Sequence, residues 1–289
     1  MAPRILLTTV LLTAHLFFPA LSEWLAIPVF IGSIITIGML HGGLDHLTAF
    51  RHFSLNDEQR KWPWFLGGYM AIIGIYGLLW LISVPLGLTL FLLLSCYHFG
   101  QLDMHEQARS AWRKPLYLSR GVFLLGLMIT AQIESVAGVI EPVMTTGYLI
   151  EFIGNWQVWL IGFIVVQHLV LLGVGTKKLN APLLTDTLIT GLMFGLLPPL
   201  LSFGLYFALW HSWDHLQLLN RYLKLPDWWS LIRNALPFTL LALAGIAGIL
   251  VLFGQSLQQP DAVIYALIGI SLLTMPHMLL VDRVVEHDH

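Results

Sequence analysis

The stretch FIGNWQVWLIGFIVVQHLVLL, residues 152–172, contains no lysine, arginine, aspartate or glutamate. At a rise of about 1.5 Å per residue, a helix of this length crosses the roughly 30 Å hydrocarbon core of a bilayer. The residues are continuously apolar rather than alternately apolar and polar, which favours a membrane-spanning helix over a strand of a membrane barrel. This stretch therefore predicts a chain that crosses a membrane as helices.

The composition of all 289 residues extends this prediction to the whole chain. Hydrophobic residues make up 57% and charged residues 10%, whereas soluble proteins carry about 25% charged residues. Such a composition excludes a cytosolic enzyme, a secreted disulfide scaffold and a disordered chain. The net charge of −2 offers no basic surface to a nucleic acid, so we expect no nucleic-acid partner. The single cysteine, Cys96, argues against a thiolate metal site.

Ten apolar stretches of the chain are candidates for membrane spans. They cover roughly residues 5–21, 24–41, 64–82, 86–101, 117–133, 152–172, 184–198, 200–219, 234–254 and 262–280. Pro198-Pro199 would make the seventh stretch half of a broken pair with the eighth, so we predict an all-α, polytopic transmembrane helical bundle of about 8–10 membrane-spanning helices. We treat residues 1–289 as a single integral-membrane domain. The first stretch resembles a cleavable signal peptide, but we expect it to be retained because further spans follow it.

The positive charges give the bundle an orientation. If the N-terminus lies in the cytoplasm, all 14 lysines and arginines fall on the cytoplasmic side of the predicted spans. The opposite loops carry acidic residues, among them Glu23, Glu134, Glu141 and Asp261, and no lysine or arginine. This distribution obeys the positive-inside rule. It predicts a multi-pass protein of the cell membrane, surrounded by lipid, with both termini in the cytoplasm.

Histidine is the unusual component of this apolar chain, with 12 residues. Ionisable residues inside membrane helices are costly and mark functional sites. His41, His98 and His211 each lie about three helical turns before the first cation of the following loop, so they sit at similar depth. His215 follows His211 by four residues and projects from the same helix face. Imidazoles from separate helices at one depth indicate a shared ligand.

The chemistry that suits these four histidines is a metal site. Neutral imidazole binds Fe, Zn, Cu or Ni, and burial in apolar surroundings keeps histidine neutral. HSWDH (211–215) would supply two ligands, His41 of HGGLDH a third, and His98 of YHFGQLD a fourth. Four nitrogen ligands leave two positions of an octahedral ion open for dioxygen and a substrate or water.

Other polar residues near these histidines have supporting or structural interpretations. Nearby carboxylates typically accept the second ring N–H of a ligand histidine. The candidates are Asp45 for His41, Asp103 for His98 and Asp214 for His215. His277 matches the depth of His215 and is a candidate for a fifth ligand or for a hydrogen-bond donor beside the ligands, but Pro276 gives it a local structural reason too. We therefore leave it outside the predicted ligand set. The remaining histidines carry no motif. We expect His46, His52 and His105 to be solvated at loop edges, and His15 and His168 to be lone helix histidines.

Four motifs resemble the signatures of a known family. HGGLDH at 41, SCYHFGQLD at 95, WHSWDHL at 210 and LTMPHMLLVDR at 273 look like those of the Brp/Blh family, the bacterial and archaeal membrane-bound β-carotene 15,15′-dioxygenases that make retinal for rhodopsins. They occur in family order over nearly the whole chain. The resemblance implies Fe(2+) held by His41, His98, His211 and His215. It also implies β-carotene and O₂ as substrates and two all-trans-retinal molecules as products, and it leaves open a rhodopsin that accepts the retinal.

Two other functions stay open on the sequence alone. A membrane desaturase or hydroxylase is also histidine-rich, but it needs two irons, an electron donor and HxxHH boxes, and no HxxHH box occurs here. A haem-binding or transport protein could use histidines on separate helices. The i, i+4 pair on one helix suits the two faces of a haem poorly, and a transporter should show repeated halves.

Overall fold

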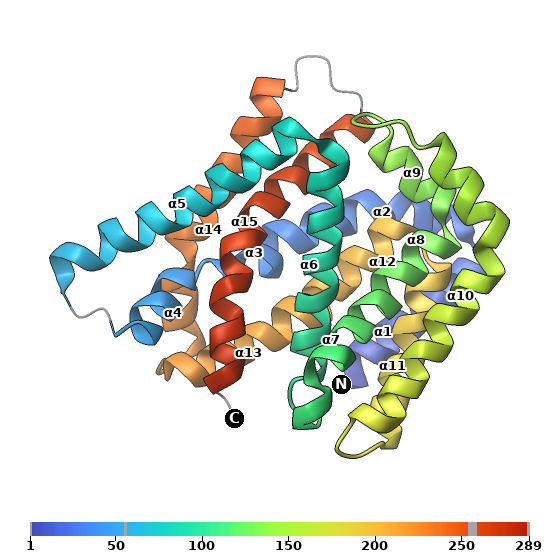
Figure 1. Cartoon of the computed structure of the whole chain (residues 1–289), viewed down its shortest axis with the longest axis horizontal. Helices are drawn as coiled ribbons and strands as arrows, with labels where there is room; N and C mark the ends of the chain where they lie inside the picture. Colours follow the sequence, from blue (N-terminus) through green and yellow to red (C-terminus); the bar gives the residue numbers. More distant parts are fainter. Residues whose placement is uncertain (1, 55–56, 254–258, 288–289) are drawn as a thin grey trace. The chain divides into compact units, whose positions relative to one another are not determined.

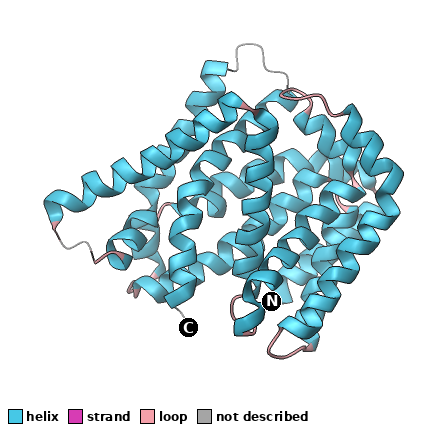
Figure 2. Cartoon of the chain, viewed as in Figure 1, coloured by secondary structure: helices cyan, strands magenta, loops and turns pink. Residues whose placement is uncertain are grey.

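The computed structural model describes residues 2–54, 57–253 and 259–287, and helices make up nearly all of them (Figure 2). Within these residues no β-strand occurs; one isolated bridge pairs Ala108 with Thr176. The predicted all-α class is therefore confirmed. The chain divides into two compact units, which are described separately. The prediction of a single domain stays a prediction.

The first unit comprises residues 1–34, 95–141 and 145–211. Its helices are α1 (Ala2–Phe17), α2 (Pro19–Ser33), the second half of α6 (Val84–Met104), η2 (Ser110–Trp112), α7 (Arg113–Gly121), η3 (Val122–Gly126), α8 (Leu127–Ala131), α9 (Ile133–Ile140), α10 (Gly147–Gly175), α11 (Ala181–Leu196), α12 (Pro199–Tyr206) and most of η4 (Phe207–Ser212). Within it α12 packs along α2, and α7 packs against α10 (Figure 1).

Local chemistry sets several helix ends in this unit. Pro19 stands in the first turn of α2, where its missing N–H costs nothing. The Asn180 side chain caps α11 by accepting a hydrogen bond from the Leu183 backbone N–H at 3.0 Å. Leu197 adopts an extended conformation before Pro198 and ends α11. The predicted break at Pro198 is therefore present.

Two glycines let α6 and α7 cross in direct backbone contact. A Cβ atom on Gly100 would lie 1.7 Å from the Tyr117 carbonyl oxygen, and one on Gly121 would lie 1.7 Å from the Cys96 carbonyl oxygen. No larger residue fits at either position without moving backbone. Small residues at helix crossings are typical of membrane bundles. This crossing fixes the part of α6 that carries His98.

The second unit comprises residues 35–94, 142–144 and 212–289. Its helices are most of η1 (Ile34–Gly38), α3 (Met39–Gly42), α4 (Asp45–His52), α5 (Glu58–Ile82), the first half of α6, α13 (Trp213–Leu223), α14 (Trp228–Phe253) and α15 (Gln259–His287). Helix α14 packs against α3 and α15, and α15 also contacts α4 and α5.

Six described helices are long and apolar enough to cross a membrane. They are Pro19–His52, Arg60–Ile82, Val84–Met104, Gly147–Gly175, Trp228–Leu252 and Ala262–Asp282. A seventh span would join Ser110–Ala131 to Ile133–Ile140, which are bent by 91°. The chain is thus a polytopic helical membrane protein, as predicted.

The ten predicted stretches lie mostly on helices, with breaks at Phe18, at Gln132 and at Leu197 and Pro198. The first stretch lies mostly on α1 and the seventh on α11, and these helices have 16 residues each and are shorter than a full span. The eighth coincides with α12, η4 and α13 and is not among the six long apolar helices. Residue 254, the predicted end of the ninth stretch, lies outside the described residues.

Candidate metal centre

Two predicted ligands adjoin π-helical segments. The described residues contain three such segments, η1, η3 and η4. Segment η1 leads directly into α3, which carries His41, and η4 contains His211. A π-helical turn is rare and is frequently found at functional sites. The irregular backbone therefore marks the same places as the histidine motifs.

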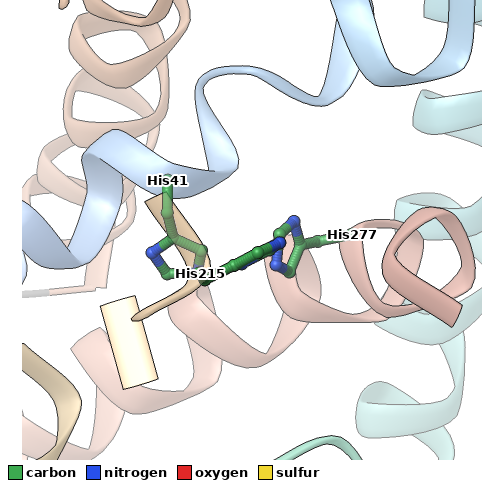
Figure 3. Close-up of side chains that lie close together, drawn as sticks. All are labelled: His41, His215 and His277. Carbon is green, nitrogen blue, oxygen red and sulfur yellow. The ribbon is translucent and has the colours of Figure 1, made fainter. Parts of the chain in front are cut away.

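Three buried histidines of the second unit converge on one point. His41 comes from α3, His215 from α13 and His277 from α15, and Figure 3 shows their rings side by side. The ring centroids lie 4.9 to 5.1 Å apart, and one nitrogen of each ring lies within 4.8 Å of the others. None of the three residues is more than 5% exposed. Small rotations of the imidazoles would bring these nitrogens onto one ion.

A carboxylate and a phenol orient one ring of this trio. Asp45 Oδ1 lies 2.7 Å from His277 Nδ1. The Tyr69 hydroxyl donates a hydrogen bond to Asp45 Oδ2 at 2.9 Å. Because a carboxylate only accepts, the proton of neutral His277 lies on Nδ1, and Nε2 is the acceptor nitrogen of that ring. This is the arrangement that commonly fixes a histidine as a metal ligand.

The glycines of HGGLDH explain how α3 reaches its position. A Cβ atom on Gly43 would lie 2.5 Å from the Ala235 carbonyl oxygen of α14. The Thr239 hydroxyl, one turn further along α14, donates a hydrogen bond to the Met39 carbonyl oxygen at 3.3 Å. Gly43 therefore allows α3 to lie directly on α14. The motif supplies both a ligand candidate and the close packing that holds it.

The other two predicted ligands pair with each other in the first unit. The ring centroids of His98 and His211 lie 4.9 Å apart at an interplanar angle of 71°. Each histidine is 1% exposed. Phe207 stacks on His211, with centroids 5.5 Å apart at 11°, and Phe99 meets the same ring edge-on at 4.6 Å. The four predicted ligands thus appear as two groups, one in each unit.

The carboxylates serve partners that their sequence positions did not indicate. Asp45 was expected to support His41 but contacts His277. Asp103 was expected to support His98, but its two oxygens accept hydrogen bonds from Arg120 Nε at 2.8 Å and from the Tyr206 hydroxyl at 3.0 Å. Asp214 is half-buried.

His277 is the residue that sequence reasoning left out and the structure places with His41 and His215. The sequence feature that could have identified it is its predicted depth in the membrane, which equals that of His215. We discounted that signal because of Pro276, yet this proline lies inside α15 without ending the helix.

The expectation of solvated loop-edge histidines was wrong for His46 and His105, which are 5% and 8% exposed. His46 stacks against both Phe238 and Trp62, at 4.4 and 5.6 Å between centroids. Each of the two histidines also places its Nδ1 within hydrogen-bond distance of a nearby backbone carbonyl oxygen. His168 hydrogen-bonds the Ser119 hydroxyl at 3.0 Å. None of these three belongs to the converging trio.

Comparison with known proteins assigns the chain to a family. The profile of the family described as "Beta-carotene 15,15'-dioxygenase" matches residues 32–284, a range that includes all five histidines of the trio and the pair. A protein of an uncultured marine bacterium, named beta-carotene 15,15'-dioxygenase, is 24% identical over 266 residues, covering 91% of this chain and 94% of its own length. A protein of Halobacterium salinarum, named probable beta-carotene 15,15'-dioxygenase Blh, is 24% identical over 290 residues, covering 88% of this chain and 84% of its own length. No solved structure matches the chain. The chain belongs to the β-carotene 15,15′-dioxygenase family.

Proposed function

We propose that this protein is an iron(II)-dependent dioxygenase that cleaves β-carotene at its central 15,15′ double bond to give two molecules of all-trans-retinal. Family membership supports the reaction and the substrate. The observation that supports a metal site is the convergence of the buried residues His41, His215 and His277. β-Carotene and one O₂ together contain the atoms of two retinal molecules, so the reaction needs no separate electron donor.

The trio fits an iron ion by the chemistry of its donors. Three imidazole nitrogens suit iron as well as zinc or copper, and their burial favours the neutral form that a ligand requires. When bound, iron supplies the O₂ chemistry that ordinary side chains lack. His41 and His215 belong both to the predicted four-histidine set and to the trio. His98 and His211 stay predicted ligands on the strength of their motifs.

The residues around the trio would hold and shield it. Asp45 and Tyr69 keep His277 in one tautomer, which leaves its Nε2 as the acceptor nitrogen for a metal ion. The apolar spans that carry His41 and His277 would keep bulk water from a reactive centre. A hydrocarbon substrate dissolves in the bilayer, so it can reach an intramembrane site without crossing water.

The charge distribution supports a finer statement about placement. We propose that the protein lies in the cell membrane with both termini in the cytoplasm, because all 14 cations then lie on the cytoplasmic side of the ten predicted spans. A fluorescent protein fused to the C-terminus should fluoresce, and alkaline phosphatase fused there should be inactive. The reverse result would contradict this orientation.

We propose a rhodopsin that accepts the retinal as the partner of this protein. Binding of such a rhodopsin to the purified enzyme, and its binding of the retinal, can be measured.

Expression in cells that accumulate β-carotene tests the function. The wild-type chain should bleach the cells and yield all-trans-retinal on chromatography of the extracted pigments. His41→Ala should leave the carotene intact and lower the iron content of the purified protein. His105→Gln, which alters another buried histidine outside the trio, should behave as wild type. Intact carotene in cells that hold folded, iron-loaded wild-type protein would contradict the proposal.

A further inference from the structure

A buried charge cluster in the first unit surrounds Arg120 of α7. The Arg120 side chain is 0% exposed. Its Nε donates to Asp103 Oδ2 of α6 at 2.8 Å, and its Nη2 donates to Asp186 Oδ2 of α11 at 3.0 Å. A buried ion pair adds little net stability over apolar side chains of the same volume, because removing charges from water is costly. The role of this cluster is therefore better sought in the geometry that it imposes.

The second oxygen of each carboxylate binds a residue close to His211. The Tyr206 hydroxyl donates to Asp103 Oδ1 at 3.0 Å. Trp210 Nε1 donates to Asp186 Oδ1 at 2.8 Å. Tyr206 ends α12, and Trp210 lies in η4 directly before His211. Arg120 is thus connected through two carboxylates to both ends of the turn that leads into His211.

A second arginine supports the same turn from α1. The Arg4 guanidinium lies 5.0 Å from the centroid of the Trp210 ring, within cation–π range. Arg4 Nη1 donates to the Leu209 carbonyl oxygen of η4 at 3.2 Å, and its Nη2 lies 3.8 Å from Asp186 Oδ1. Two arginines and two aspartates balance in charge. A π-helical turn such as η4 is uncommon in helices, and here Arg4 of α1 and Asp186 of α11 contact it directly.

We propose that Arg120 is a positioning residue for His211. Through Asp103 and Asp186 it holds Tyr206 and Trp210, and these fix the π-helical turn from which the His211 ring meets His98. Because Asp103 lies on the same helix as His98, the cluster sets the two histidines against each other. This inference rests on the proposed function, in which His211 is a predicted ligand of the metal.

Two conservative substitutions test the inference in the full chain in detergent. Tyr206→Phe and Trp210→Phe each delete one donor and keep an aromatic ring. We measure Co²⁺ affinity, the visible absorption of the Co²⁺-loaded protein and the thermal midpoint of the metal-free protein. Loss of a group that orients a ligand costs about 10–100-fold in metal affinity, so each variant should lose about 10-fold and shift the cobalt spectrum. Arg120→Met should lose more, and Arg120→Lys should recover part of the loss.

A matched control separates positioning from general stability. Tyr76→Phe deletes a buried hydroxyl of the second unit that donates to the Gly87 carbonyl oxygen at 2.9 Å. It should lower the thermal midpoint as Tyr206→Phe does and leave the cobalt spectrum unchanged.

The remaining outcomes distinguish failure of this inference from failure of the proposed function. If His211→Ala loses the metal while Tyr206→Phe and Trp210→Phe keep wild-type affinity and spectrum, the inference is overturned and the proposed function stands. If His211→Ala keeps the wild-type spectrum, His211 is no ligand, and the positioning role falls with it. Failure of the wild-type chain to bind metal and make retinal would instead overturn the proposed function.

Discussion

The histidine trio of the second unit and the histidine pair of the first unit are held by different neighbours. A carboxylate touches the trio directly, since Asp45 orients His277. The pair is packed by the rings of Phe99 and Phe207, and the nearby carboxylate Asp103 binds Arg120 and Tyr206. The trio thus resembles a ligand set with its own hydrogen-bonded support. The pair depends on the backbone turn that carries it, so proximity of a carboxylate in sequence does not reveal which histidine it serves.

Among the substitutions that test this comparison, His277→Ala should have the largest effect on metal affinity. If the trio binds the metal ion, His277→Ala removes one of three converging ligands. Metal affinity should then fall by more than the roughly 100-fold seen for supporting residues. Iron content of the purified protein and retinal yield in carotene-accumulating cells measure this. His98→Ala, measured in the same way, tests whether the histidine pair also binds the metal ion. Full metal in His277→Ala together with none in His98→Ala would show that the pair, not the trio, holds the ion.

Asn at Asp45 should have a smaller effect, because it changes the support and keeps every imidazole. Its amide cannot replace the carboxylate as an acceptor for both the His277 Nδ1–H and the Tyr69 hydroxyl without turning a donor toward one of them. Metal affinity should fall by about 10–100-fold. Titration of the metal-free protein with Co²⁺ checks this value. Wild-type affinity in a folded Asp45→Asn protein would separate Asp45 from the metal site.

Tyr69→Phe should have the smallest effect on metal affinity. It removes one hydrogen bond to Asp45 Oδ2 and leaves the contact between Asp45 and His277 in place. The net value of one such bond is about 1 kcal/mol, or about 5-fold in affinity, with more for a charged acceptor. The same cobalt titration measures it, with Tyr76→Phe as the control for loss of a buried hydroxyl. A larger loss than that of Asp45→Asn would place Tyr69 in direct contact with the ion or its substrate.

The fold followed from the sequence because lipid imposes a simple rule. A chain that is 57% hydrophobic must satisfy its backbone internally, and long apolar stretches do so as helices. Even the break at Pro198 could be predicted from proline chemistry. The π-helical turns could not, because they depend on neighbours such as Arg4, which reaches Leu209 from the far end of the sequence. The predicted single domain, the orientation and the four-ligand set remain predictions.

The candidate site was predicted in part, and the missing parts are long-range contacts. Depth and the i, i+4 spacing brought out His41 and His215, which do converge. His277 was set aside because Pro276 suggested a local cause. His46 was expected at the surface because its stacking partner Phe238 lies almost two hundred residues away on α14. Spacing along one helix is readable from sequence, whereas contacts between helices require the packed structure.

The contact between Asp45 and His277 joins residues separated by 232 positions in the chain. During synthesis, His41 enters the membrane long before the ribosome reaches α15, the last described helix. The nascent protein therefore has two rings of the trio in place and lacks the third until α15 has been made. The trio would capture iron only in chains that include α15. A product that stalls before α15 would lack the complete trio.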